Sequence, residues 1–279
     1  MRVIKCLTFI ILSLIGLILH TNSCGNRNQN VDKVLAESDR IMELQPDNAL
    51  KLLNTIVSPL DLDSYQYNRY LLLQIQAKDK TIQDITSDTI IFKVKDYFVN
   101  KKDNKNSALA YYYSGRVLDE QKNTKGAMLS YLYAETYVTA LTDNHMLKGV
   151  IQSSMGYLLY DQLLYSEALT HFNKACEYFQ LADNIEKEVI LHINIGDCWA
   201  LIQEPDSAIY SYNKGLDLAN ISQDSTLRVG VLHNLAVLYK DLESFNEAKL
   251  LFRQAMSLAT KNEEKENLYL NLSQIFTRA

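Results

Sequence analysis

The sequence predicts an all-α protein: an α-solenoid of about five to six antiparallel helical hairpins, with a half repeat at the C-terminal end. The 279 residues include 9 glycines and 3 prolines, so few positions are expected to adopt a positive φ or to interrupt a helix. Hydrophobic residues make up 47% of the chain and charged residues 22%, which is the balance of a folded domain. The third observation is a pattern that recurs about every forty residues in the second half of the chain.

Four copies of one motif carry this repetition. Each copy has a small residue, a second small residue twelve positions later, an aromatic residue after four more, and a third small residue after another three. Residues three and four apart share a helix face, and two antiparallel helices approach closely only where small residues meet. We therefore expect each copy to form one hairpin with its aromatic ring packed beside the small residues. The copies are Gly115, Ala127, Tyr131 and Ala134; Gly156, Ala168, Phe172 and Ala175; Gly196, Ala208, Tyr212 and Gly215; and Ala236, Ala248, Phe252 and Ala255.

The four copies resemble the tetratricopeptide repeat (TPR), which has small and aromatic residues at these spacings. The likeness extends to tetratricopeptide lipoproteins of the Bacteroidetes type and covers nearly the whole mature chain, including the stretches PDNALKLLNTI, ITSDTIIFKVKDYF and AYYYSGRVL. The resemblance implies a non-enzymatic scaffold that binds a protein or peptide in the groove lined by the first helix of each repeat. The lysine–asparagine clamp with which some relatives grip a terminal carboxylate is absent from the corresponding positions.

The amino-terminal segment predicts export. Arg2 and Lys5 precede a mainly apolar run over residues 6–19, which is too short to span a bilayer and has the length of a secretory signal. Ser23-Cys24-Gly25 at its end resembles the lipobox of bacterial lipoproteins, although Thr21 stands where that family prefers leucine. The expectation is a signal peptide over 1–23, acylation of Cys24, and a membrane-anchored lipoprotein facing the periplasm, on the outer rather than the inner membrane. The alternative is ordinary signal-peptidase cleavage that leaves Cys24 unmodified.

Downstream of the leader, the sequence predicts diverged helical hairpins over 24–100, a polar joint at 101–106, and the regular array over 107–279. The diverged part contains expected helices at 31–44, 48–57, 62–78 and 88–99, and Asp47 is expected to cap the second of them. The joint has the sequence KKDNKN. A terminal helix over 267–279 is expected to begin a fifth repeat, with Ser273 in the position of the small packing residue.

Several function classes are disfavoured by the residues themselves. The net charge of −5 would repel a phosphate backbone, so nucleic acid is a poor partner. No glycine-rich phosphate-binding loop occurs in the sequence. Cys176 and Cys198 fall on different predicted helices and the histidines are scattered, so we expect buried free thiols and neither a metal site nor a small-molecule cofactor. No constellation of residues predicts catalysis.

The candidate site is the groove expected on the first helices. Tyrosine and arginine are good recognition anchors because they combine apolar area with hydrogen bonding, and Tyr112 and Arg116 are expected to lie alongside Tyr157 and Tyr160. The alternative is that half-exposed tyrosines only cover linker surface. The residues expected to bind a partner are Tyr112, Arg116, Ser153, Tyr157, Tyr160, Asn194, Asp197, His233 and Asn234.

The sequence therefore predicts a protein-interaction scaffold in the cell envelope. One alternative is the sensor part of a longer TPR regulator that lacks its membrane helix and output domain. Another is a glycan-capture lipoprotein, a class that stacks sugars on exposed tryptophans. The single tryptophan, Trp199, is expected to lie in a helix core position, which argues against glycan capture.

Overall fold

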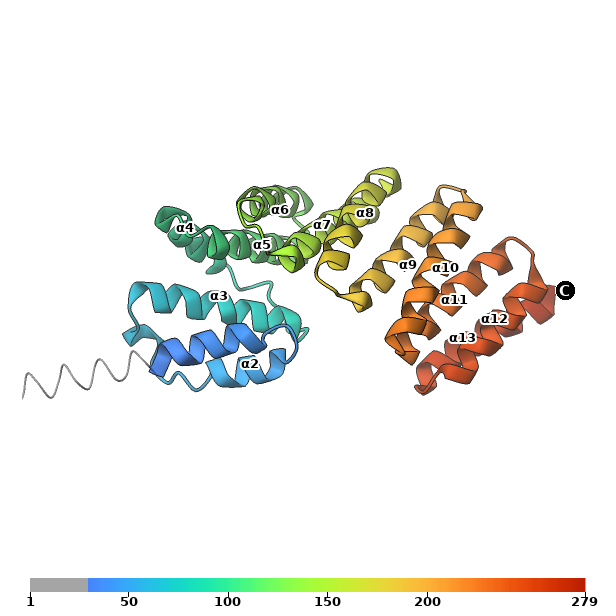
Figure 1. Cartoon of the computed structure of the whole chain (residues 1–279), viewed down its shortest axis with the longest axis horizontal. Helices are drawn as coiled ribbons and strands as arrows, with labels where there is room; N and C mark the ends of the chain where they lie inside the picture. The colour runs from blue at the N-terminus through green and yellow to red at the C-terminus, as the bar shows by residue number, and fades with distance from the viewer. Residues whose placement is uncertain (1–29, 279) are drawn as a thin grey trace, which may run out of the picture. The chain divides into compact units, whose positions relative to one another are not determined.

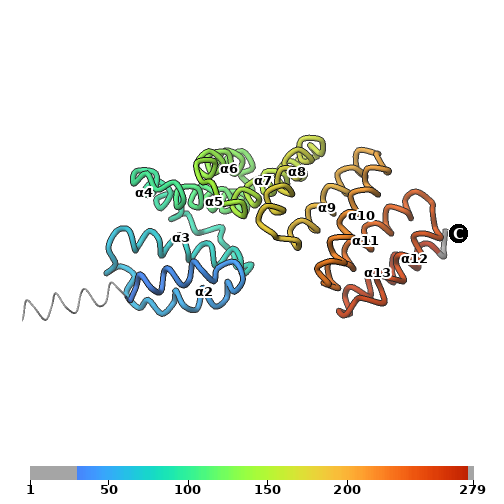
Figure 2. Tube along the Cα trace, viewed as in Figure 1, coloured from blue at the N-terminus to red at the C-terminus, as the bar shows by residue number. Residues whose placement is uncertain are grey.

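The computed structural model describes residues 30–278, so the expected signal peptide and the expected lipidation site Cys24 lie outside the described residues. Within them the regular secondary structure is helical (Figure 1 and Figure 2), which confirms the all-α prediction. No helix in this part of the chain is long and apolar enough to span a membrane. A helix over residues 30–41 is followed by α2 (Pro46–Leu53), η1 (Pro59–Asp61), α3 (Ser64–Lys80), α4 (Ile91–Lys101), α5 (Asn104–Glu120), α6 (Thr124–Thr139), α7 (His145–Asp161), α8 (Tyr165–Leu181), α9 (Ile185–Leu201), α10 (Pro205–Ser222), α11 (Ser225–Asp241), α12 (Phe245–Leu258) and α13 (Asn262–Arg278).

The chain divides into two compact units, one ending at Ser130 and the other beginning at Tyr131, so the boundary lies within α6. The segment 101–106, expected to be a joint, contains only two residues outside the helices. Lys102 adopts a left-handed conformation with φ of 57° and closes α4. Asp103 then caps α5, because its side chain accepts a hydrogen bond from the backbone N–H of Asn106 at 3.1 Å.

The first unit begins with three packed helices. The helix over 30–41, α2 and α3 enclose an apolar cluster that includes Leu35, Ala49 and Leu53. Two helices were expected here at 31–44 and 48–57, and both are present, each beginning and ending earlier than expected. The expected N-cap was wrong: Gln45 occupies that position, and Pro46 begins α2 because a proline lacks only an N–H that is unpaired at a helix start.

In the second unit, consecutive helices pack in antiparallel pairs and the motif residues form the contacts between them. A Cβ atom on Gly156 would lie 2.6 Å from the ring of Phe172, and one on Gly196 would lie 2.5 Å from the ring of Tyr212. Such distances are shorter than real Cβ contacts, so only glycine fits under these rings. The small residues and the aromatic residues of the motif therefore pack as the sequence predicted.

The turns between helices differ from expectation. The shortage of glycine predicted few positive φ angles, yet eight non-glycine residues adopt them and no glycine does in the described part. Most close a helix by the same pair of hydrogen bonds, as where the N–H of Leu163 bonds to Tyr160 and that of Leu164 to Leu159. This Schellman geometry satisfies the last carbonyls of the helix, which stabilises the left-handed residue even without glycine. The eight are Ile82, Lys102, Lys122, Leu163, Asp183, Gln203, Gln223 and Glu243.

The terminal helix α13 is present, but the expected position of its small packing residue was wrong. Ser273 is exposed, and its hydroxyl donates to the Leu270 carbonyl of its own helix at 2.8 Å. Leu268 and Ile275 are buried and join the cluster around Phe252. Ile275 lies forty residues after the buried Leu235, so the repeat continues in phase into this helix.

Candidate functional site

One face of the second unit gathers the polar side chains of four successive first helices, α7, α9, α11 and α13. Contacts between next-but-one helices connect α9 to α11 and α11 to α13. We call this surface the first-helix face. The side chains that form it are Tyr157, Tyr160, Asn194, Asp197, His233, Asn234, Lys240, Asn271 and Gln274.

Tyr157 and Asn194 are the first pair that the structure brings together on this face. The Nδ2 of Asn194 donates to the Oη of Tyr157 at 2.7 Å. The Tyr157 side chain is 40% exposed, and its ring meets Phe172 edge-on with centroids 5.2 Å apart. Partial burial raises the pKa of Tyr157 above its usual value. Tyr157 therefore has one side of its ring on the core and the other exposed to solvent.

Asp197 lies in a hollow of about 210 Å³ between α7, α9, α10 and α11. The Tyr212 hydroxyl donates to Oδ1 of Asp197 at 2.5 Å. Burial raises the pKa of the Asp197 carboxyl, whereas the Tyr212 hydrogen bond and nearby His233 act in the opposite direction. Tyr160 lines the same hollow and packs its ring edge-on against Tyr165.

A chain of hydrogen bonds links α11 to α13. The Nδ2 of Asn271 lies 3.3 Å from Nε2 of His233, and Oδ1 of Asn271 accepts from Lys240 at 3.0 Å. Since the amide nitrogen must donate, Nε2 of His233 accepts and Nδ1 carries the ring proton. That proton is directed at Oδ1 of Asn234, 3.1 Å away. His233 and Asn234 also line a second hollow, of about 280 Å³.

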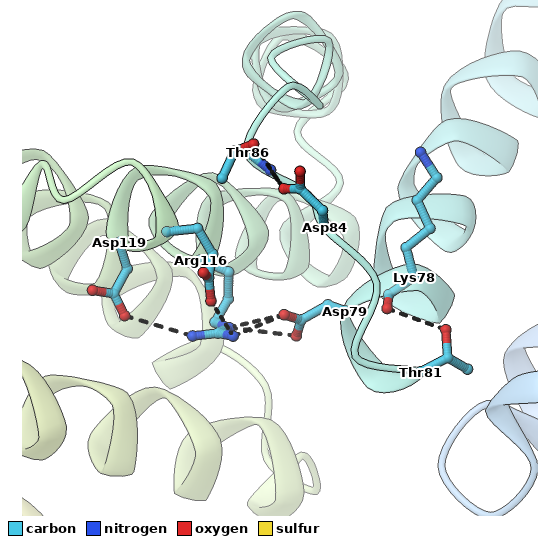
Figure 3. A network of polar contacts seen from close by, with 8 residues as sticks. Lys78, Asp79, Thr81, Asp84, Thr86, Arg116 and Asp119 are labelled. Carbon is cyan, nitrogen blue, oxygen red and sulfur yellow. Dashed lines mark hydrogen bonds and ion pairs between the residues drawn. The ribbon is translucent and has the colours of Figure 1, made fainter.

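Tyr112 and Arg116 belong to the first unit, and the structure gives them other roles than exposed anchors. Tyr112 is only 9% exposed and packs edge-on against Tyr113. Arg116 forms an ion pair with Asp79 at the end of α3, where its Nη2 lies 2.9 Å from Oδ1 of Asp79. Its Nη1 lies 3.5 Å from Oδ2 of Asp119 (Figure 3). Both side chains thus hold the first unit together.

Some site residues could not be foreseen, and one expected residue is not linked to the others. Ser153 bonds back to the Val150 carbonyl of its own helix at 3.1 Å.

Tyr212 was expected to be core packing alone, because a motif position predicts burial but not the partner of a hydroxyl. Asp241 lines the Asp197 hollow from the end of α11, and Asn271 joins from α13. The only available signal was that Asp241 lies forty-four residues after Asp197, one helix turn beyond the repeat.

Trp199 packs against two of the core clusters, as the sequence predicted, but it is not fully enclosed. It is half-buried and lines a hollow of about 430 Å³ between α8, α9 and α10, together with Tyr210. His192 lies in the same hollow, where burial and the charge of Lys214 lower its pKa to about 4. A histidine with that pKa is neutral at physiological pH.

The two cysteines of the described chain are free thiols. Cys198 is buried and Cys176 half-buried. Burial raises the pKa of both to about 12. Because the thiolate is the reactive form, neither is activated as a nucleophile.

No protein-family model and no curated protein matches the sequence. Solved structures match its fold. The apo form of RapI gives a TM-score of 0.75 at 15% identity and covers 89% of this chain and 71% of that chain. The apo form of the quorum sensor NprR from B. thuringiensis gives 0.67 at 15% identity, over 90% and 72%. NprR in complex with its cognate peptide NprX gives 0.61 at 16% identity, over 91% and 74%.

Identities this low establish the fold alone. The helix pairs, the small and aromatic packing positions and these matches agree on one architecture. The chain is therefore an all-helical, TPR-like repeat protein, similar in fold to RapI and NprR.

Proposed function

We propose that the first-helix face of the second unit binds an extended peptide segment, free or part of a larger protein, without catalysing a reaction on it. The observation that carries this proposal is the series of amide side chains on successive first helices. Asn194 lies on α9, Asn234 on α11, and Asn271 and Gln274 on α13. A side-chain amide offers one donor group and one acceptor, which is the pairing that a peptide main chain needs.

The hydrogen bonds already made by these amides leave room for a ligand. Asn194 and Asn234 are both half-buried. Nδ2 of Asn194 is used by Tyr157, and Oδ1 of Asn234 by His233. Among the described residues, the acceptor of the first and the donor of the second have no such partner. The exposed side of Tyr157 adds an aromatic surface beside them. The solved complex of NprR with its cognate peptide supports peptide binding by this fold.

Replacing both asparagines should weaken peptide binding. With Asn194→Ala and Asn234→Ala combined, we expect captured peptides to bind at least about ten-fold more weakly, because two main-chain hydrogen bonds of about 1 kcal/mol each are lost. The measurement is binding of the full chain to an array of short synthetic peptides, followed by titration of each positive sequence.

The matched control changes two asparagines on α10, Asn213→Ala and Asn220→Ala, which are exposed and lie outside the first-helix face. This variant should bind like the wild type. Equal losses in both double variants, or binding that survives removal of Asn194 and Asn234, would place the peptide elsewhere.

We also propose that the protein is anchored through an acylated Cys24 to the periplasmic side of the cell envelope, at the outer membrane. Support comes from the apolar run over 6–19 and the Ser23-Cys24-Gly25 sequence. The apolar side chains of Val57 and Leu60 are 92% and 84% exposed, which is compatible with a position next to a membrane. Val31, in the first turn of the helix over 30–41, and Ile56, next to Val57, pack against the same apolar cluster.

The variant Cys24→Ser tests the anchor. We expect it to lose incorporation of labelled fatty acid and to leave the membrane fraction, because the acyl chains attach through that thiol. The double variant Val57→Ser with Leu60→Ser, which leaves the thiol in place, should still be labelled. Unchanged labelling of Cys24→Ser would exclude the anchor without affecting the peptide-binding proposal.

A further inference from the structure

We propose that the hollow around Asp197 is a subsite for one positively charged side chain, arginine or lysine, of the bound peptide. This inference rests on the proposed peptide binding and narrows its ligands to segments that carry a basic residue. The hollow of about 210 Å³ lies entirely within the second unit. It is lined by Tyr160, Asp197, Ala200, Leu201, Tyr212, Asn234, Val237, Leu238 and Asp241.

The charge of the lining is one-sided. Asp197 on α9 and Asp241 at the end of α11 contribute two carboxylates, and the lining contains no lysine or arginine. Lys240, next to Asp241 in sequence, directs its ammonium group to Asn271 and Gln274 on α13. Two carboxylates around one small hollow favour a cation and disfavour an anion or a second acid.

Asp197 keeps an unused acceptor. Its Oδ1 receives the Tyr212 hydroxyl at 2.5 Å, whereas Oδ2 accepts no hydrogen bond from the described residues and is not sealed from solvent. Burial raises the pKa of Tyr212 far above its usual value, so the hydroxyl stays protonated and fixes the carboxylate as an acceptor. A guanidinium or ammonium group at Oδ2 would form a charge-assisted hydrogen bond in a half-buried setting, where such bonds are strongest.

The remaining walls fit the aliphatic part of a basic side chain. The rings of Tyr160 and Tyr212 and the side chains of Leu201, Val237 and Leu238 supply apolar surface. Arginine and lysine place their methylene stems on such surface while the charged end reaches a polar partner. A neutral polar side chain could donate a hydrogen bond to Oδ2 but, like an aliphatic one, would leave both carboxylates without a counter-charge.

The position of Asn234 connects this subsite to the peptide main chain. Asn234 lines both the Asp197 hollow and the neighbouring hollow of about 280 Å³ that contains His233. A peptide whose main chain is held by Asn234 therefore passes the entrance of the Asp197 hollow. One of its side chains can enter there without a change in the helices.

The test compares peptides that differ at a single side chain. Each sequence captured by the full chain is resynthesised with arginine, lysine, citrulline or norleucine at every position in turn. Citrulline has the size of arginine without its charge, so it isolates the electrostatic contribution. At one position we expect arginine or lysine to bind about ten-fold more tightly than citrulline or norleucine, the usual size of one charge-assisted hydrogen bond.

Two variants assign this preference to the hollow. Asp197→Asn keeps the size of the side chain and an oxygen for the Tyr212 hydroxyl, and it should reduce the ten-fold preference to nearly none. Asp241→Asn changes the opposite wall and should reduce it in part. The control is Asp217→Asn, an exposed aspartate on α10, which removes the same charge and should leave the preference intact. Thermal melting checks that each variant is folded, and if Asp197→Asn unfolds, Asp241→Asn and the wild-type peptide series decide.

The outcomes distinguish a failure of this subsite from a failure of the proposed peptide binding. If no peptide binds, both fail. If peptides bind but citrulline equals arginine at every position, or the preference survives in both aspartate variants, the subsite is overturned and the binding face stands. A preference lost in Asp197→Asn and kept in Asp217→Asn establishes the subsite.

Discussion

Gly149→Val is expected to destabilise the second unit by about 3 kcal/mol, because a side chain there overlaps the core. A Cβ atom on Gly149 would lie 2.6 Å from the ring of Phe179, and that ring is 1% exposed and cannot move into solvent. Urea unfolding of the full chain, followed by far-ultraviolet circular dichroism, measures the change. A repeat array can unfold in steps, so the transition that shifts is the one to analyse.

The neighbouring repeats contain the compensating change. Forty and eighty residues after Gly149 the chain has Val189 and Val229, and at the positions that correspond to Phe179 it has Ala219 and Ala259. Val189 and Ala219 belong to one buried cluster, and Val229 and Ala259 to another. One repeat thus combines a glycine with a phenylalanine at these two positions, and the next two repeats combine a valine with an alanine.

The double variant Gly149→Val with Phe179→Ala should therefore be more stable than the sum of its parts. Phe179→Ala alone should cost about 3–5 kcal/mol by leaving a cavity, and the added valine should fill part of it. We expect a favourable coupling energy of about 1–3 kcal/mol in the double-mutant cycle. Additive losses would show that these two positions do not share one packing space.

Arg116→Met is expected to destabilise the first unit by about 2 kcal/mol. The methionine retains the apolar stem but leaves Asp79, Asp119 and Glu120 without the guanidinium that lies among them. The Asp79 side chain is only 13% exposed, so contact with water cannot make up for the interaction that its carboxylate loses with the guanidinium. The expected loss of stability is smaller than that for breaking a fully buried ion pair, because 26% of the Arg116 side chain is exposed.

A surface ion pair in the same unit provides the control. Arg40 lies 2.6 Å from Glu37, and both side chains are largely exposed. Arg40→Met should leave the urea midpoint unchanged, since exposed pairs contribute little. Arg116→Lys should fall between wild type and Arg116→Met, because lysine keeps the charge but lacks the planar fork of donors that fits a carboxylate. If Arg116→Met and Arg40→Met behave alike, the contact with Asp79 does not stabilise the unit.

The sequence by itself determined the fold class and the buried positions of the repeats. Gly156 and Phe172, or Gly196 and Tyr212, could be paired because small and aromatic residues at fixed spacings meet across any hairpin of two long helices. This information is local: it depends on the helical period and on side-chain size. The same reasoning located Ala49 and Leu53 in the diverged first hairpin.

Only the tertiary structure decided what the polar side chains do. Arg116 was expected to be an exposed anchor, yet its partner Asp79 lies 37 residues upstream on another helix. Tyr212 was expected to be core, and its hydroxyl instead orients Asp197 on α9. A hydrogen bond depends on the register between neighbouring helices and on side-chain torsions, neither of which is encoded in the spacing of residues along one helix. The repeat pattern therefore predicts where side chains are buried, and the packing of the helices selects their polar partners.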